Sequence, residues 1–304
     1  MKTRSFEAAD GTTLAGYEWH PAGEARAILQ IAHGMAEHAQ RYARVADAFT
    51  AQGWLVVAHD HRGHGESVPP GETPGHMGND DAWNTVVGDL LGITRTVAGE
   101  HGKLPLVLLA HSMGSFMAQQ LLFTQPDEYA AVALSGSNGK PPPIAQLGRV
   151  ITRLERLRLG RHRNSNLLQK LSFGDFNKGF PGRTEFDWLS RDDDEVDKYV
   201  ADPLCGFPVS VQSWLDFIDA VVGLTDPAKL ARIPKDKPVY LFAGANDPVG
   251  DRGAGVERLA QSYRDAGLTN LLIRLYPDAR HETLNETNRD EVIADLFAWA
   301  SQWV

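Results

Sequence analysis

The sequence predicts an α/β fold in which a mostly parallel central sheet is flanked by helices and carries an inserted helical cap. Three observations lead to this prediction. Short apolar segments alternate with longer amphipathic ones, the alternation stops in the middle of the chain, and it resumes near the carboxyl end. Short apolar runs of this kind are typical of strands buried on both faces, and their alternation with helices favours a parallel sheet.

The first block of this pattern predicts three strands and three helices in alternation. The strands are expected at 27–33, 54–60 and 105–111, and the helices at 41–53, 84–102 and 115–125. Right-handed crossovers place the carboxyl ends of parallel strands at one edge, where open α/β sheets keep their sites.

The second block predicts a strand, a helix, a strand and a helix, at 238–244, 255–267, 271–277 and 290–304. The segment between the two blocks begins with Gly-Lys-Pro-Pro-Pro and shows helical patterns at 144–160, 195–203 and 211–224. We therefore expect core at 1–136, a helical cap at 137–233 and core again at 234–304, a division that suits a chain of 304 residues.

Composition narrows the classes of function. The net charge of −9 disfavours a polyanionic partner, so nucleic-acid binding is not expected. No apolar run reaches the roughly 18 residues of a membrane span, and the amino terminus carries no signal-peptide pattern. The single cysteine, Cys205, fits a reducing compartment, and the cytoplasm is the expected location.

The catalytic prediction starts from Ser112. A buried-strand pattern is followed by Ala110-His111-Ser112-Met113-Gly114 and then by a helical pattern. Small residues two before and two after a serine allow the sharp turn called a nucleophile elbow, although alanine stands where glycine is usual. Ser112 is therefore the predicted nucleophile, and helix N-cap serine is the structural alternative.

A serine hydroxyl needs a base and a third group that orients the base, and in this type of fold they follow the serine in the order acid, histidine. Two histidines follow Ser112, and His281 is preferred to His162 because it follows a predicted strand through a short loop. Asp247 ends another predicted strand and is the expected acid, with Asp251 as the fallback.

The oxyanion hole is expected to use the backbone N–H groups of Met113 and Met35, because Met113 follows the nucleophile and Gly34 permits a tight turn before Met35. His33 is interpreted as a residue that braces this loop. The histidines in "HDHRGHGES" approach a zinc-binding spacing, but Gly63 stands where that motif requires aspartate. We therefore expect neither a metal nor another cofactor.

The segments "HGMAEHAQRY", "DHRGHGES", "AHSMG", "DPVG" and "RHETLNE" together resemble the monoacylglycerol lipase and lysophospholipase group of α/β-hydrolases, and the likeness extends to "TEFDWLSRD" and "VDKYVADPLCGF" in the cap. The resemblance implies the α/β-hydrolase fold and a carboxylic ester hydrolase for lipids with one acyl chain, acting through an acyl-enzyme. It also implies an apolar tunnel under the cap, with Glu37, Arg41 and Tyr199 around the glycerol group. Ala110 and Ser115 depart from the group's glycines.

Several alternatives remain open at this point. Lysophospholipase activity would use the cap arginines to attract a phosphate, and an aminopeptidase is possible because one fold hosts many activities. A binding scaffold without catalysis is the alternative from another class. The amphipathic pattern at 144–160 either makes transient contact with a lipid surface or is an ordinary solvated helix face.

Overall fold

The computed structural model describes residues 1–102, 104–141 and 144–304. Within them, eight strands form one sheet in the order β1-β2-β4-β3-β5-β6-β7-β8. Strand β2 pairs antiparallel with β1 and β4, and every other neighbouring pair is parallel. The strands are β1 (Lys2–Glu7), β2 (Thr13–Trp19), β3 (Ala27–Ala32), β4 (Trp54–His59), β5 (Leu106–His111), β6 (Ala131–Ser135), β7 (Val239–Gly244) and β8 (Leu271–Tyr276). The predicted fold class is confirmed, and the amino-terminal hairpin β1–β2 adds two strands to it.

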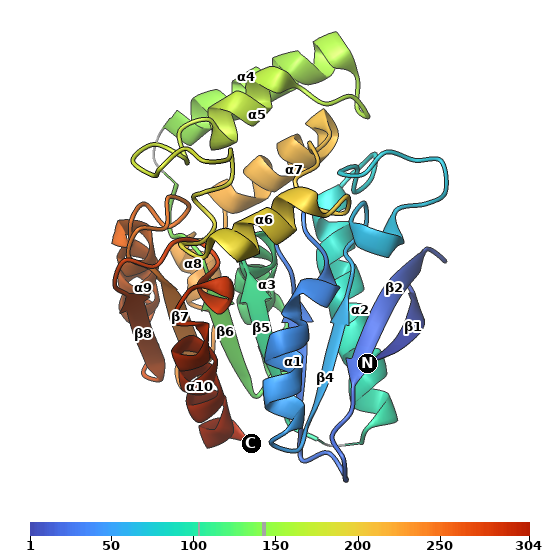
Figure 1. Cartoon of the computed structure of the whole chain (residues 1–304), viewed down its shortest axis with the longest axis vertical. Coiled ribbons are helices and arrows are strands. Elements are labelled where there is room, and N and C mark those ends of the chain that lie inside the picture. The colour runs from blue at the N-terminus through green and yellow to red at the C-terminus, as the bar shows by residue number, and fades with distance from the viewer. Residues whose placement is uncertain (103, 142–143) are drawn as a thin grey trace.

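Helices cover both faces of the sheet (Figure 1). Helices α1 (Ala43–Thr50) and α10 (Arg289–Ala300) pack on one face, and α2 (Ala82–Glu100), α3 (Met113–Thr124) and α9 (Ala254–Asp265) pack on the other. Because strand side chains alternate between faces, Leu108 of β5 joins the second layer while Val107 and Leu109 join the first. This double burial explains why the central strands are mostly apolar, with Gln30, His59 and His111 among the buried polar exceptions.

The described residues between β6 and β7, in the segment predicted to form a cap, include five helices. They are α4 (Ile144–Leu159), α5 (Asn166–Phe173), α6 (Asp193–Ala201), α7 (Val211–Val222) and α8 (Pro227–Leu230), and Figure 1 shows α4 to α7 above the sheet. Side chains of Ser165, Asp192 and Ser210 accept backbone N–H bonds at the starts of α5, α6 and α7. Asp193, Asp194 and Glu195 lie in the first turn of α6, where carboxylates interact favourably with the helix dipole.

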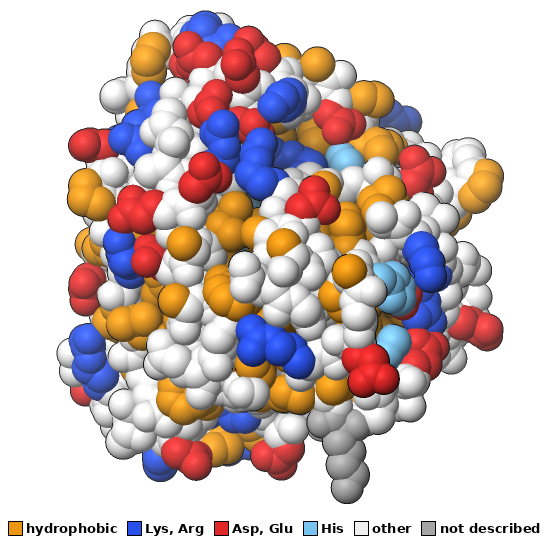
Figure 2. Space-filling model, turned by 60° about the horizontal axis from the view of Figure 1, so that its bottom comes forward, with side chains coloured by type: hydrophobic (Ala, Val, Ile, Leu, Met, Phe, Trp, Pro, Cys, Tyr) orange, Lys and Arg blue, Asp and Glu red, His pale blue; other side chains and the backbone are white. Residues whose placement is uncertain are grey.

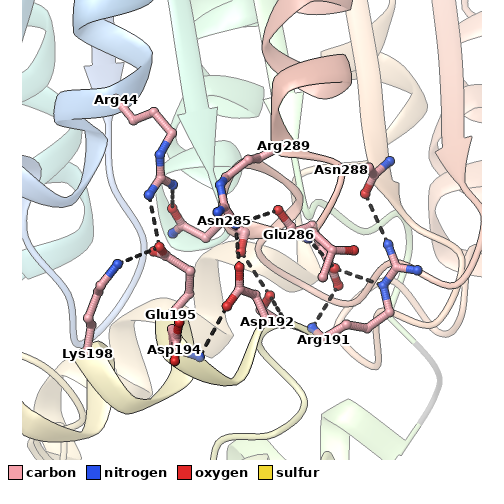
Figure 3. A network of polar contacts seen from close by, with 12 residues as sticks. Arg44, Arg191, Asp192, Asp194, Glu195, Lys198, Asn285, Glu286, Asn288 and Arg289 are labelled. Atoms are coloured by element: carbon pink, nitrogen blue, oxygen red, sulfur yellow. Dashed lines mark hydrogen bonds and ion pairs between the residues drawn. The ribbon is translucent and has the colours of Figure 1, made fainter.

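Ion pairs fasten α6 and the chain before it to the core (Figure 3). Glu195 pairs with Arg44 of α1 at 2.9 Å, and Arg191 pairs with the buried Glu286 at 2.8 Å. Asp192, the N-cap of α6, pairs with Arg289 of α10 at 2.5 Å. These contacts come from two separate parts of the core chain, α1 and the segment from Glu286 to Arg289, so this portion of the insertion has a defined position over the sheet edge.

Short 3₁₀ turns complete the chain, at η1 (Ala39–Tyr42), η2 (Gly65–Ser67), η3 (Pro126–Glu128), η4 (Thr283–Asn285) and η5 (Ser301–Trp303). In the described part of the chain, no helix combines the length and the apolar character that crossing a membrane requires. The face turned forward in Figure 2 carries acidic and basic side chains interspersed with small apolar areas.

Candidate active site

Ser112 lies at the sharp turn between β5 and α3, with φ of 49° and ψ of −117°. Such backbone strain in a non-glycine residue is typical of a nucleophile elbow. The Ser112 N–H donates to the carbonyl of Ser135 at 2.9 Å, which ties the turn to β6. Gly114 is required here because a Cβ would lie 2.4 Å from the carbonyl oxygen of Ala32. Ala110 is completely buried, so alanine fits the position where glycine is usual.

His281 and Asp247 approach Ser112 from the loops after β8 and β7. The Nδ1 of His281 is 3.0 Å from the Oδ1 of Asp247, and both residues are buried. The same Oδ1 accepts the Val249 N–H at 2.8 Å, which holds the carboxylate in place. Ser112 and His281 line one cavity, so the three predicted residues converge at the carboxyl edge of the sheet.

The other candidates for acid and base lie elsewhere. Asp251 is exposed and pairs with Arg258 at 2.9 Å. His162 stacks against His76 with ring centroids 4.0 Å apart and is not part of the cavity lining. Neither side chain is placed to orient or replace His281.

The pKa of His281 lies above its ordinary value of 6.5 because opposing effects do not cancel. Burial is the largest single effect and lowers the pKa, but the charge and hydrogen bond of Asp247, together with the charges of Glu282 and Glu37, raise it by more. Around the ring, Trp188 and His111 lie with centroids 5.1 and 4.6 Å away. Gly136 leaves room for it, since a Cβ there would lie 2.8 Å from the His281 Cε1.

The predicted oxyanion donors flank Ser112. Met113 is the first residue of α3, and the first N–H groups of a helix have no acceptor within it. Met35 lines the same cavity as Ser112, and the loop approaches closely, since a Cβ on Gly34 would lie 3.1 Å from the Ser112 Cβ. Ala36 has a left-handed φ of 56°.

His33 braces this loop, as the sequence predicted. Its Nε2 accepts the His61 N–H at 2.9 Å, so its Nδ1 carries the proton and donates to the Gly34 carbonyl at 2.7 Å. Burial, aided by the neighbouring His64, holds the pKa of His33 well below its usual range, so the ring stays neutral. The brace is therefore a fixed hydrogen-bond bridge between the loops after β3 and β4.

The three residues expected around an alcohol group belong to one buried ion cluster. Arg41 pairs with Glu37 at 2.6 Å and with Glu282 at 2.7 Å. The Oε1 of Glu37 also accepts the Gly34 N–H at 2.6 Å and the Tyr42 hydroxyl at 2.9 Å. The Arg41 guanidinium lies over the Tyr199 ring, 4.8 Å from its centroid. Glu37, Tyr199 and Glu282 line the cavity, whereas Arg41 stands behind them.

The cavity has a volume of about 680 Å³ and lies between the sheet edge and the cap segment. Polar groups gather near Ser112 and His281. Apolar side chains, mostly from the cap segment, form another part of the lining: Phe173, Phe186, Trp188, Leu189, Phe207 and Val249. The cavity is therefore lined by both polar and apolar side chains, and the nucleophile and its histidine face it.

The alternative zinc site is not assembled as the spacing suggested. His61 Nδ1 lies 3.1 Å from His59 Nε2, and His64 Nδ1 bonds the Arg62 carbonyl at 2.9 Å. Among the described residues, the groups whose ligand atoms lie close enough to share a metal ion are two other sets, His38 with Asp202 and Cys205, and Glu18 with Glu100 and His101.

Two residues of the site were missed by sequence reasoning. Glu282 follows His281 directly and lines the cavity, and its position next to the predicted base was an available signal. Trp188 covers the His281 ring, but nothing in its local pattern indicates which part of the core it would contact.

Known proteins resemble this chain over nearly its whole length. It is 28% identical to the monoacylglycerol lipase of Mycolicibacterium smegmatis over 97% of this chain and 95% of that protein. It is 28% identical to the monoglyceride lipase of Mus musculus, over 96% and 88% of the two chains. A thermostable carboxyl esterase from Bacillus coagulans, solved in complex with glycerol, superimposes with a TM-score of 0.91 at 26% identity, covering 99% and 98%.

The family model described as serine aminopeptidase, S33, matches residues 23–288, which include the loop after β3, the elbow and both residues of the Asp247–His281 pair. The structural relatives share the mostly parallel sheet and its helical layers. The chain therefore belongs to this family of α/β-hydrolases, described as serine aminopeptidase, S33.

Proposed function

We propose that the chain is a serine ester hydrolase that cleaves monoacylglycerols or similar single-acyl-chain lipid esters through an acyl-enzyme. The observation that carries this proposal is the strained Ser112, which lines one cavity with His281, and the buried pairing of His281 with Asp247. The relatives named monoacylglycerol lipase support the choice of substrate.

In the proposed reaction, the Ser112 hydroxyl attacks the ester carbonyl while His281 accepts its proton. Asp247 orients the ring and stabilises the imidazolium. The N–H groups of Met35 and Met113 donate to the oxygen that becomes negative in the tetrahedral intermediate. His281 then protonates the leaving alcohol, which leaves the acyl group bound to Ser112. In the second half of the reaction, water attacks the acyl-enzyme while His281 accepts its proton, and His281 then returns the proton to the Ser112 oxygen as the carboxylic acid is released.

The mixed polar and apolar lining of the cavity suits the two halves of such a substrate. The apolar side chains would bury the acyl chain. Each Å² of apolar surface removed from water stabilises the bound state by about 25 cal/mol. Glu37 and Glu282 would accept hydroxyl groups of the alcohol. Described partners occupy three of the roughly four acceptor positions on each carboxylate, which leaves one on each for the substrate. Arg41 acts from behind by holding both carboxylates, and Tyr199 completes the wall.

A lysophospholipid is the second candidate substrate, and Lys170 is the observation that favours it. Lys170 lines the outer cavity, and its ammonium group would attract a phosphate.

We also assign residues 137–233 the role of a cap that approaches lipid surfaces. Exposed apolar side chains recur at three- and four-residue spacing on α4, with Leu157 85% exposed, and continue on α5. They are Leu147, Val150, Leu154, Leu157, Leu167 and Leu171. Arginines on the same helix would favour anionic headgroups. The proposed location is the cytoplasm, which suits the buried free thiol of Cys205.

The test is an activity panel of a monoacylglycerol, a lysophospholipid, a nitrophenyl acyl ester and an aminoacyl amide. Ser112→Ala should abolish fluorophosphonate labelling and nearly all ester turnover, whereas the matched Ser262→Ala on α9 should retain both. Labelling of Ser112→Ala at the wild-type level would contradict the nucleophile assignment. Turnover of the amide alone would favour a peptidase, and turnover of none would favour a binding scaffold.

A further inference from the structure

The peptide group between Gly34 and Met35 carries the N–H proposed to bind the oxyanion. Its carbonyl accepts the His33 Nδ1–H at 2.7 Å. Because C=O and N–H point in opposite directions across a trans peptide, this bond aims the Met35 N–H away from His33. On the amino-terminal side, Glu37 fixes the Gly34 N–H at 2.6 Å. One side of the oxyanion loop is thus held by the core.

The other side of the loop is Ala36, whose φ of 56° is left-handed. A residue with a Cβ adopts this conformation at a cost, so Ala36 reverts to an ordinary conformation unless something holds it. The peptide groups on its two sides would turn with it, including the one that follows Met35. Met35 lies between that peptide group and the one held by His33, so the aim of its N–H depends on both anchors, and one of them is whatever holds Ala36.

Two donors from the cap segment hold the Ala36 carbonyl. The Tyr199 hydroxyl and the Gly206 N–H each donate to it at 2.9 Å. Tyr199 is 6% exposed, and its ring is fixed between the Arg41 guanidinium at 4.8 Å and the Phe186 ring at 5.0 Å. The Tyr199 proton is directed at the backbone, so it is not free to bond a substrate hydroxyl.

We propose that Tyr199 is a positioning residue for the oxyanion hole: its hydroxyl holds Ala36 in the strained conformation that aims the Met35 N–H. This inference rests on the proposed serine-hydrolase function and adds a role to Tyr199 beyond the wall of the alcohol pocket. Tyr199 lies on α6, so its hydroxyl reaches the Ala36 carbonyl only when that helix packs on the core. The formation of the oxyanion hole therefore depends on the position of α6.

The experiment compares Tyr199→Phe, Ala36→Gly and the double variant, with Tyr263→Phe as the matched control. Tyr263 is fully buried, and its hydroxyl has no hydrogen-bond partner among the described residues, so its loss should leave kcat unchanged. Glycine adopts positive φ without strain, so Ala36→Gly should reduce the dependence of the loop on Tyr199. The values of kcat and KM are measured with a nitrophenyl acyl ester and a monoacylglycerol.

Tyr199→Phe should lower kcat about three- to tenfold for both substrates, with little change in KM for the nitrophenyl ester, because transition-state binding is lost. Adding Tyr199→Phe to Ala36→Gly should lower kcat less than about twofold, since the strain is already absent. Equal losses in both backgrounds would overturn the proposal. A loss confined to the monoacylglycerol, or no loss at all, would overturn it as well.

The failure of this inference is distinguishable from that of the proposed function. Wild-type ester turnover tests the function, and the ratios among the variants test the role of Tyr199. If Tyr199→Phe folds poorly, as judged by its thermal transition, Ala36→Val probes the same loop with Tyr199 intact. A β-branched residue disfavours positive φ more strongly than alanine, so kcat should fall for both substrates. Wild-type kcat in Ala36→Val would contradict the role assigned to the left-handed residue.

Discussion

Arg41 forms a two-point salt bridge with Glu282, the residue that follows His281. Its Nη1 lies 2.7 Å from Glu282 Oε1, and its Nη2 lies 2.7 Å from Glu282 Oε2. The bridge joins the loop after β3 to the loop after β8, which are 241 residues apart in the chain. Since Arg41 also binds Glu37, one guanidinium connects the oxyanion loop to the loop that carries the histidine.

Arg41→Ala should destabilise the protein by about 3–5 kcal/mol, because it leaves two buried carboxylates without their cation. Arg95→Ala is the control. Arg95 pairs with Glu128 at the surface with its side chain 55% exposed, so its loss should cost less than about 1 kcal/mol. The free energy of unfolding is measured with denaturant. Similar losses in the two variants would show that the cluster contributes no more than a surface pair.

Glu282→Gln should distinguish substrates that carry free hydroxyls from those that do not. Losing charge-assisted bonds to the alcohol should lower kcat/KM for a monoacylglycerol about five- to a hundredfold, equivalent to roughly 1–3 kcal/mol. A nitrophenyl acyl ester has no such hydroxyls, so its kcat/KM should change much less. Glu257→Gln, an exposed change on α9, controls for the general effect of charge removal. Equal losses on both esters would refute the alcohol pocket.

Asp247→Asn should lower kcat by roughly 10³- to 10⁴-fold without unfolding the chain, because the amide neither orients His281 correctly nor stabilises its imidazolium. Asp251→Asn is the matched change on the same loop, and it should leave kcat near the wild-type value because Asp251 pairs with Arg258 at the surface. The kcat values are compared alongside circular dichroism. If the effects of the two substitutions were exchanged, Asp251 would be the acid.

The fold was predictable from the sequence because its central strands are buried on both faces. Segments such as 105–110 are continuously apolar, and longer segments with helical character alternate with them. The amino-terminal hairpin was missed because β1 is mostly exposed, with five of its six residues not fully buried, and so carries no apolar run. An exposed edge segment becomes a strand because it pairs with a neighbouring strand, and its own sequence pattern does not reveal that neighbour.

The site was partly predictable for a related reason. Ser112, Asp247 and His281 follow predicted strands, so the topology alone places them at one edge. Glu282 directly follows the predicted base, so its place was within reach of the same reasoning, whereas the position of Tyr199 depends on how the segment after β6 folds back over that edge. Contacts such as Tyr199 with the Ala36 carbonyl join residues 163 positions apart, and no local pattern encodes them. The resemblance to a family selected Tyr199, but the resemblance did not indicate its backbone partner.

Dialysis against EDTA should leave ester turnover unchanged, because the proposed mechanism generates its nucleophile by proton transfer to His281. Turnover is measured before and after dialysis and again after zinc is added back. If dialysis abolished turnover and added zinc restored it, ester hydrolysis by this chain would depend on a metal. His61→Ala and Cys205→Ser would then decide which group of possible ligands is responsible.

The acid limb of the pH profile should have its midpoint above 6.5, the ordinary pKa of histidine, because His281 must be neutral to accept the proton. Burial lowers the pKa of His281, but the Asp247 carboxylate, together with Glu282 and Glu37, raises it by more. In Asp247→Asn, burial remains and the carboxylate is gone, so the midpoint should move to lower pH. Profiles of kcat/KM with a neutral ester, and an NMR titration of ¹⁵N-labelled histidine, measure the shift independently of residual turnover. An unchanged midpoint in Asp247→Asn would mean that Asp247 does not control the charge of His281.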